Sequence, residues 1–190
     1  MNYPDDSKLE IDFRISLLPI HFQNKILKYA SLQKQQQRLE GLKLLEKIFL
    51  DNNLSLNDLQ FNKNSKPFVN DKVDFSLSYS NKNVVLGFIK NGKIGVDLEE
   101  IKPINLSDFK DYFTKIELSL ITNSNKIDTN FCKLWTRKEA VSKALGLGAF
   151  LDFKSFEVLE NEIYINNKRI RISSELISEK YWLSKAISTI

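Results

Sequence analysis

The chain contains a single cysteine, Cys132, and a single histidine, His21, among its 190 residues. An internal disulfide needs two cysteines, and a Cys/His zinc site needs several such ligands. A Ser-His-Asp triad would depend on His21, which lies near no serine motif. The chain also lacks a Gly-rich phosphate loop. Its chemistry must therefore use carboxylates, lysines, arginines and hydroxyls.

Proline and glycine are also scarce, with 4 and 6 residues, whereas there are 13 phenylalanines. With 42% hydrophobic and 27% charged residues, this composition is typical of a folded globular protein. No apolar run reaches the roughly 18 residues that a membrane-spanning helix needs. Residues 1–10 are polar and acidic, unlike a secretory signal. We therefore expect a cytoplasmic protein that does not contact membranes.

The net charge is only +4, but basic residues gather between His21 and Leu39. That stretch contains no acid, and its basic residues are Lys25, Lys28, Lys34 and Arg38. Such a surface attracts anions, although a solvated helix face gives the same pattern. The low overall charge and the lack of an aromatic-basic motif argue against nucleic acid as the ligand.

Two short motifs carry the most information. The first is Gly95-Val96-Asp97-Leu98-Glu99, and the second is Trp135-Thr136-Arg137-Lys138-Glu139-Ala140-Val141-Ser142-Lys143. In a strand, Asp97 and Glu99 point from the same face, and in a helix, Glu139 and Lys143 lie one turn apart. Three carboxylates are oxygen ligands that suit Mg²⁺, and Mg²⁺ with lysines suits a phosphate-bearing substrate.

Each motif alone has an ordinary structural explanation. Asp97 and Glu99 could form the solvent face of a strand, and Glu139 and Lys143 could be a helical pair worth about 0.3 kcal/mol. Lys138 is expected on the surface. The presence of both motifs in one chain favours the metal interpretation.

The hydrophobic pattern predicts an α+β fold. A helical pattern covers residues 24–50, with a break near 33–37, and three strands at 74–80, 83–90 and 93–99 form an antiparallel meander through Asn91-Gly92. Short helices are expected at 107–113 and 115–121, a longer helix up to 145, and strands at 153–159, 162–166, 168–172 and 180–189. This order predicts two α+β units in tandem, residues 1–101 and 102–190.

The two motifs, in this order and spacing, resemble those of the Sfp-type phosphopantetheinyl transferase family. The first resembles G-[IV]-D-[IVL]-E, and the second fits W-x-x-K-E-[AS]-x-x-K at every fixed position. Lys66-Pro67 and the segment from Phe75 to Ser80 resemble a G-K-P lead-in followed by F-N-[IL]-S-H-S. The resemblance covers roughly residues 25–189.

This resemblance implies a pseudo-two-fold pair of α+β subdomains, each with an antiparallel sheet packed against a long helix. It implies an enzyme that transfers the phosphopantetheine arm of coenzyme A to a serine of an apo carrier protein of fatty-acid, polyketide or peptide synthesis, releasing adenosine 3′,5′-bisphosphate. Mg²⁺ is the implied cofactor, and Mn²⁺ uses similar ligands. The implied state is a monomer that contains an internal pseudo-dimer.

The resemblance also assigns roles to individual residues. Asp97, Glu99 and Glu139 would hold the metal. The catalytic residues would be Asp97, Glu139 and Lys143: Glu139, or a water that it holds, would accept the serine proton, and Lys143 would stabilise the leaving group. Coenzyme A would be bound by Lys28, Arg38, Lys66, Ser78, Tyr79 and Lys143, with Arg38 on the 3′-phosphate. Glu117 matches a family F-[ST]-x-x-E motif near the metal.

The chain departs from the family pattern at Tyr79, where a histidine is usual, and at Ser76, where an asparagine is usual. Tyrosine can donate a hydrogen bond but carries no positive charge at neutral pH. Two alternatives remain open: a relative that binds coenzyme A or a carrier protein without transfer, and a basic nucleic-acid binder.

Overall fold

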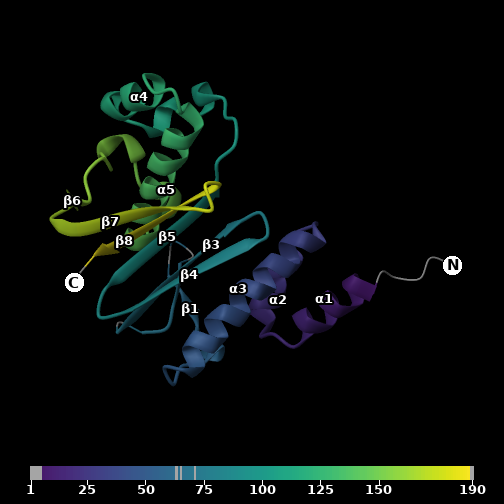
Figure 1. Cartoon of the computed structure of the whole chain (residues 1–190). Coiled ribbons are helices and arrows are strands. Elements are labelled where there is room, and N and C mark those ends of the chain that lie inside the picture. The colour runs from purple at the N-terminus through teal and green to yellow at the C-terminus, as the bar shows by residue number, and fades with distance from the viewer. Residues whose placement is uncertain (1–5, 63, 65, 71, 189–190) are drawn as a thin grey trace. The chain divides into compact units, whose positions relative to one another are not determined.

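The computed structural model describes residues 6–62, 64, 66–70 and 72–188. The chain forms two compact units (Figure 1). The first contains residues 1–59 and 82–84, and the second contains residues 60–81 and 85–190. The expected division of the sequence at residues 101–102, and the internal duplication, stay predictions.

The first unit is helical. Its elements are α1 (Asp6–Ser16), α2 (Ile20–Leu27), α3 (Leu32–Leu50) and the 3₁₀ helix η1 (Leu56–Asp58). The three α-helices contact one another and bury apolar residues such as Ile15, Leu45 and Phe49. The predicted break in the helical pattern is real but lies at residues 28–31, earlier than expected, and α1 was not predicted.

The strands that the structure describes lie in the second unit, apart from the start of β4. They are β1 (Gln60–Phe61), β2 (Pro67–Phe68), β3 (Val73–Ser80), β4 (Asn83–Lys90), β5 (Lys93–Glu100), β6 (Glu162–Ile165), β7 (Lys168–Ile177) and β8 (Tyr181–Ser188), and β4 has its first residues in the other unit. β1 pairs with β2, β3 pairs with β4, and the largest sheet has the order β5-β8-β7-β6 with antiparallel neighbours.

The predicted three-strand meander is therefore wrong in its pairing, although its three strands exist. β5 follows β4 through the Asn91-Gly92 turn but pairs with β8, from Lys93↔Ser188 to Glu100↔Tyr181. The turn signal is local, whereas the partner of β5 lies some 90 residues further along the chain. Only the tertiary packing selects that partner.

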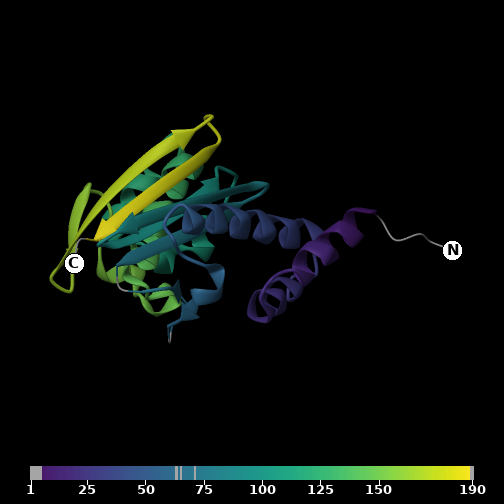
Figure 2. The same cartoon turned by 90° about the horizontal axis from the view of Figure 1, so that it is seen from below.

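The remaining elements of the second unit are helices. They are η2 (Leu106–Asp108), η3 (Lys110–Tyr112), α4 (Lys115–Thr122), α5 (Ile127–Leu145), η4 (Gly148–Phe150) and η5 (Phe153–Ser155). α5 contacts β5, β8 and β7 and lies along one face of their sheet (Figures 1 and 2). It ends at Gly146, which has φ 68°, the left-handed conformation that glycine adopts without a Cβ clash. The strand predicted at 153–159 is instead η5 followed by irregular chain.

Side chains between α5 and the sheet form the main core of the second unit. The buried members include Phe131, Val141, Val158, Ile170 and Ala186. An α+β fold is thus confirmed, with α5 fixed against the strand that carries Asp97 and Glu99. Within the described residues, no helix is long and apolar enough to cross a membrane.

Candidate functional site

The first motif lies on β5, as predicted. Val96 and Leu98 are 3% and 4% exposed and belong to the core. Asp97 is also buried, with 3% exposure, whereas Glu99 is half-buried near the end of the strand. The acid face of β5 is therefore not a solvent face, and Asp97 needs compensation for its buried charge.

Lys143 of α5 supplies that compensation. Its Nζ lies 2.6 Å from Asp97 Oδ1 and also donates to the Val96 carbonyl at 3.2 Å and to Ser78 Oγ at 3.3 Å. The side chain of Lys143 keeps 28% of its surface exposed, so the ion pair borders solvent on one side. The second motif therefore meets the first, as the sequence predicted.

Glu99 and Glu139 belong electrostatically to the same cluster. Burial, followed by the charges of Asp97 and Glu139, raises the pKa of Glu99 to about 7, and Lys143 opposes this. Burial and the charge of Asp97 also raise the pKa of Glu139, and Lys143 again opposes it. The three carboxylates repel one another in a partly desolvated place, and Lys143 offsets only part of this repulsion. A cation there would relieve the repulsion.

The carboxylates fit a hard divalent cation by their chemistry. Asp97 Oδ2 is buried and accepts no hydrogen bond from a described residue, so one oxygen lacks the partner that a buried charge requires. All the donors are oxygens, the set that Mg²⁺ prefers. As the side chains stand, no three His, Cys, Asp or Glu residues in the described ranges form a ready-made metal cage. The metal assignment of Asp97, Glu99 and Glu139 therefore stays a proposal.

Of the predicted coenzyme A residues on β3, Ser78 lies within this cluster. Ser78 is buried at 4% exposure, and its hydroxyl donates to Asp97 Oδ1 at 2.8 Å. Tyr79 is half-buried and lies on the opposite face of β3, together with Phe75 and Leu77. The structure therefore joins Ser78 to Asp97.

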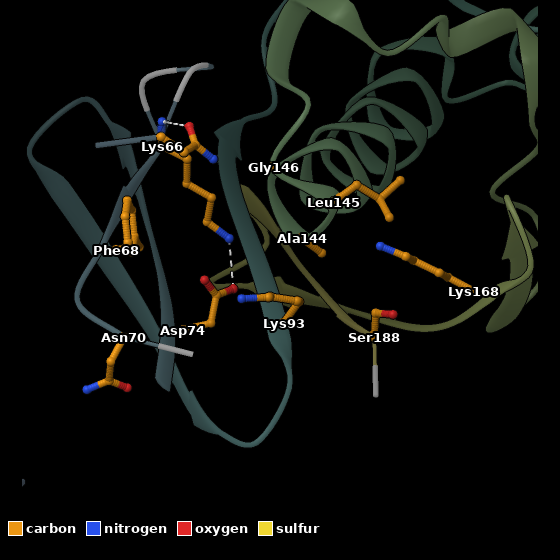
Figure 3. Close-up of a pocket in the computed structure, with 11 residues that line it drawn as sticks. Lys66, Phe68, Asn70, Asp74, Lys93, Ala144, Leu145, Gly146, Lys168 and Ser188 are labelled. Atoms are coloured by element: carbon orange, nitrogen blue, oxygen red, sulfur yellow. Dashed lines mark hydrogen bonds and ion pairs between the residues drawn. The ribbon is translucent and has the colours of Figure 1, made fainter. Parts of the chain in front are cut away.

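Lys66 lines a pocket of about 250 Å³ at the end of α5 (Figure 3). Its Nζ pairs with Asp74 Oδ2 at 2.7 Å, and Lys93 and Lys168 line the same pocket. Burial lowers the pKa of Lys66, while the nearby Asp74 raises it. The pocket therefore carries more ammonium than carboxylate groups among its described lining residues.

Lys28 and Arg38 belong to the first unit. Lys28 is exposed just after α2, and Arg38 of α3 is half-buried, with its Cζ 5.0 Å from the centre of the Tyr29 ring. Their proposed contacts with coenzyme A stay predictions.

The expectation that Lys138 lies on the surface is wrong. Its Nζ and the carboxylate of Glu117 form an ion pair at 2.9 Å, and both side chains are fully buried. Lys138 also donates to the carbonyls of Phe153 and Phe156, at 2.7 and 2.8 Å. Glu117 accepts from the backbone N–H of Val158 at 2.9 Å as well. The pair joins α5 to α4, and its further hydrogen bonds hold both helices to the chain that follows α5.

The sequence holds a signal for one part of this clamp. Thr114 and Glu117 form a capping box at the start of α4, in which each side chain accepts from the backbone N–H of the other residue. The spacing T-x-x-E is the usual signature of such a box. Nothing in the neighbouring sequence indicates that the Glu117 carboxylate also forms an ion pair with Lys138.

Comparison with protein-family models supports the resemblance. Residues 93–186 match the model of the 4′-phosphopantetheinyl transferase superfamily. Among solved structures, a holo-(acyl-carrier-protein) synthase from Bacillus anthracis in complex with CoA (3′,5′-ADP) aligns with a TM-score of 0.44 and 21% identity, over 52% of this chain and 96% of that one.

Curated relatives carry the same family name. The 4′-phosphopantetheinyl transferase gsp of Aneurinibacillus migulanus is 30% identical over 77% of this chain and 65% of its own length. The 4′-phosphopantetheinyl transferase ffp of Bacillus subtilis is 29% identical, over 82% and 72% of the two chains. Sfp of Bacillus subtilis (strain 168) is 34% identical, over 55% and 49%. The match thus spans about half to three quarters of these relatives. Over residues 93–186 the chain is similar to the 4′-phosphopantetheinyl transferase superfamily, and the curated relatives that it matches, Sfp among them, carry that name.

Proposed function

We propose that the protein transfers the phosphopantetheine arm of coenzyme A to a serine hydroxyl of an apo carrier protein. The observation that carries this proposal is the meeting of the two family motifs at Asp97 and Lys143, 2.6 Å apart. The superfamily match over residues 93–186, which contains both motifs, supports the same reaction. The serine oxygen attacks the β-phosphorus of coenzyme A, a new phosphoester bond forms, and adenosine 3′,5′-bisphosphate leaves.

Each residue of the cluster has a proposed part in this reaction. Asp97, Glu99 and Glu139 would hold Mg²⁺, and the bound ion would supply positive charge to neutralise the diphosphate. Glu139, whose pKa is raised by burial, accepts the proton of the carrier serine. Lys143, at the solvent side of the cluster, stabilises the charge that develops on the leaving phosphate. Such a reaction depends mainly on positioning and electrostatics.

The coenzyme is held by basic groups outside the cluster. Lys66, already desolvated in its pocket, binds phosphate once coenzyme A competes with Asp74 for its ammonium group. Arg38, with Lys28 on the same helical unit, binds the 3′-phosphate, where a guanidinium can make two hydrogen bonds. Tyr79 donates a hydrogen bond where the family has a histidine.

The partner is an apo carrier protein. Carrier proteins of this kind are acidic, so a pI near 9.0 favours their encounter with this chain. We propose a monomer that works in the cytoplasm, where the lone Cys132 stays reduced.

The test is intact-mass spectrometry of apo carrier proteins incubated with this chain, coenzyme A and Mg²⁺. We expect a mass gain of one phosphopantetheine group, no gain in EDTA, and a severe loss with Asp97→Ala. Lys154→Ala, which removes an exposed lysine paired with Asp111, is the matched control and should keep full activity. No gain with carriers from fatty-acid, polyketide and peptide synthesis, while coenzyme A still binds, would indicate a relative that has lost transfer.

A further inference from the structure

β3 contacts β5 through side chains. Alternate residues of β3 present a polar side chain towards β5, and each accepts a hydrogen bond from a backbone N–H of that strand. These bonds run from Ile94 to Asp74 (2.7 Å), Val96 to Ser76 (3.1 Å), Leu98 to Ser78 (3.1 Å) and Glu100 to Ser80 (3.1 Å). We call this row the β3–β5 seam.

The seam has a structural purpose that all its members share. The opposite edge of β5 pairs with β8, so the N–H groups facing β3 would be buried without an acceptor if the side chains were absent. Ser76, Ser78 and Ser80 are all buried, at 7%, 4% and 7% exposure. Loss of any one hydroxyl should therefore destabilise the protein to a similar degree.

Ser78 differs from Ser76 and Ser80 because every hydrogen-bonding position of its hydroxyl is occupied. It donates its only proton to Asp97 Oδ1 at 2.8 Å. It accepts from the Leu98 N–H at 3.1 Å and from Lys143 Nζ at 3.3 Å. A hydroxyl has one donor and two acceptor sites, so no donor remains for a phosphate oxygen.

The other two serines provide graded comparisons. Ser80 approaches Glu99 Oε2 at 3.5 Å, the long limit of a hydrogen bond. Ser76 accepts from Val96, and the neighbouring β5 residue, Gly95, has no carboxylate for it to contact. Ser76 is therefore a matched control that shares the structural bond of Ser78 but not its contact with an acid.

We propose that Ser78 is a positioning residue: it fixes Asp97 Oδ1 and so leaves the buried Oδ2 for a divalent cation. This assignment rests on the proposed function, in which Asp97 binds Mg²⁺. It replaces the expectation that Ser78 contacts a phosphate of coenzyme A. The lysine and the serine hold the same carboxylate oxygen, so Asp97 keeps one orientation. Partners of this kind typically change metal affinity by about 10–100-fold when removed.

The experiment compares Ser78→Ala with Ser76→Ala by thermal unfolding of the full chain, in EDTA and across a titration with MgCl₂ alone. In EDTA we expect both variants to melt a few degrees below the wild type, by similar amounts. Mg²⁺ should raise Tm of the wild type and of Ser76→Ala over the same concentration range. Ser78→Ala should need an Mg²⁺ concentration at least about 10-fold higher for the same rise in Tm, and Ser80→Ala should need an intermediate concentration.

Ser78→Thr provides the rescue, because it keeps the hydroxyl. We expect its Mg²⁺ response to match the wild type, and this variant also serves if Ser78→Ala does not fold. Equal Mg²⁺ responses of Ser78→Ala and Ser76→Ala would overturn the positioning role, as would a Ser78→Thr variant that responds like Ser78→Ala. A wild type without any Mg²⁺ response would also overturn it. Phosphopantetheine transfer by the same preparation would show that the proposed function survives that failure.

Discussion

At the scale of single residues, Asp97 and Lys143 form the decisive contact. Asp97 is 3% exposed, and a buried carboxylate at that depth is costly without a partner. Lys143 reaches it at 2.6 Å from a helix that starts some 30 residues after β5. The same ammonium that stabilises the fold therefore lies where we propose that a phosphate of coenzyme A binds.

Lys143→Ala should reduce transfer by about 100-fold or more, because one positioned cationic donor to a developing charge is typically worth that much. Steady-state rates from the mass assay measure this, and circular dichroism checks the fold. Lys143→Arg should recover part of the activity by restoring the charge. Normal transfer rates in Lys143→Ala would mean that a group other than Lys143 stabilises the charge on the leaving group.

Cys132 should be unreactive in the folded protein. It is 4% exposed, and burial raises the pKa of its thiol to about 12, so little thiolate exists near pH 8. Labelling with a disulfide reagent at pH 8 should be at least roughly 100-fold slower than for a free thiol. One thiol per chain should appear after unfolding in guanidinium. Fast native labelling would mean that the region between β5 and α5 opens readily.

At the scale of elements, α5 is held from two sides. One side approaches β5, and the other side is clamped by Lys138 and Glu117. Glu139 directly follows Lys138 on the helix, and Lys143 contacts Asp97 and Val96 of β5. The orientation of two candidate catalytic residues thus depends on groups that take no part in the reaction.

Removing one partner of the clamp should be strongly destabilising. Glu117→Ala leaves the Lys138 ammonium buried without its carboxylate and should lower the free energy of unfolding by about 3–5 kcal/mol. The double variant Glu117→Leu/Lys138→Met removes both charges and should recover a large part of that loss. Denaturant unfolding of the single and double variants measures the difference. A double variant less stable than the single one would show that the bonds from Lys138 to the Phe153 and Phe156 carbonyls outweigh its charge pairing with Glu117.

Gly95→Ala should damage the contact between β5 and α5. A Cβ on Gly95 would lie 1.9 Å from the Ala140 carbonyl oxygen and 2.5 Å from the Ala144 nitrogen, both backbone atoms that cannot move aside. A Cβ on Gly148 would meet nothing within 4 Å, so Gly148→Ala is the control, with only a cost for its φ of 55°. We expect the decrease in Tm caused by Gly95→Ala to be several-fold larger than that caused by Gly148→Ala. Equal losses would mean that α5 can shift on the sheet without penalty.

At the scale of the whole molecule, the residues that we propose bind coenzyme A fall in both units. Lys66, Tyr79 and Lys143 belong to the second unit, whereas Lys28 and Arg38 belong to the first. Their assignment to one ligand comes from the family resemblance, so a ligand-based experiment is the direct test.

Arg38→Ala should weaken binding of coenzyme A about 10-fold or more, because a charge-assisted hydrogen bond to phosphate is worth roughly 1.5–3 kcal/mol. It should change binding of dephospho-coenzyme A, which lacks the 3′-phosphate, very little. Isothermal titration calorimetry with both ligands measures this, and Lys34→Ala, on the same helix, is the control. An equal loss of affinity for both ligands would contradict the proposal that Arg38 binds the 3′-phosphate.

Much of this protein could be predicted from local patterns. Asp97 and Glu99 on a strand, Glu139 and Lys143 on a helix, and Gly146 as the helix end all follow from periodicity and residue type. The break in the first helical segment was displaced by several residues, since such boundaries depend on small differences in helix propensity. The strand expected near 153–159 fails because the Phe153 and Phe156 carbonyls bond to Lys138 and not to a neighbouring strand.

The sequence by itself determined the α+β class, the two motifs and the family resemblance, because strand and helix periods and the spacing of acids and lysines are local properties. Only the tertiary structure decided that β5 pairs with β8 and not with β4, and that Lys138 is buried in an ion pair with Glu117. It also decided that the Ser78 hydroxyl donates its proton to Asp97. Each of these depends on groups far apart in the chain competing for one partner. Such competition is settled by burial and hydrogen bonding in the folded state, which no local pattern records.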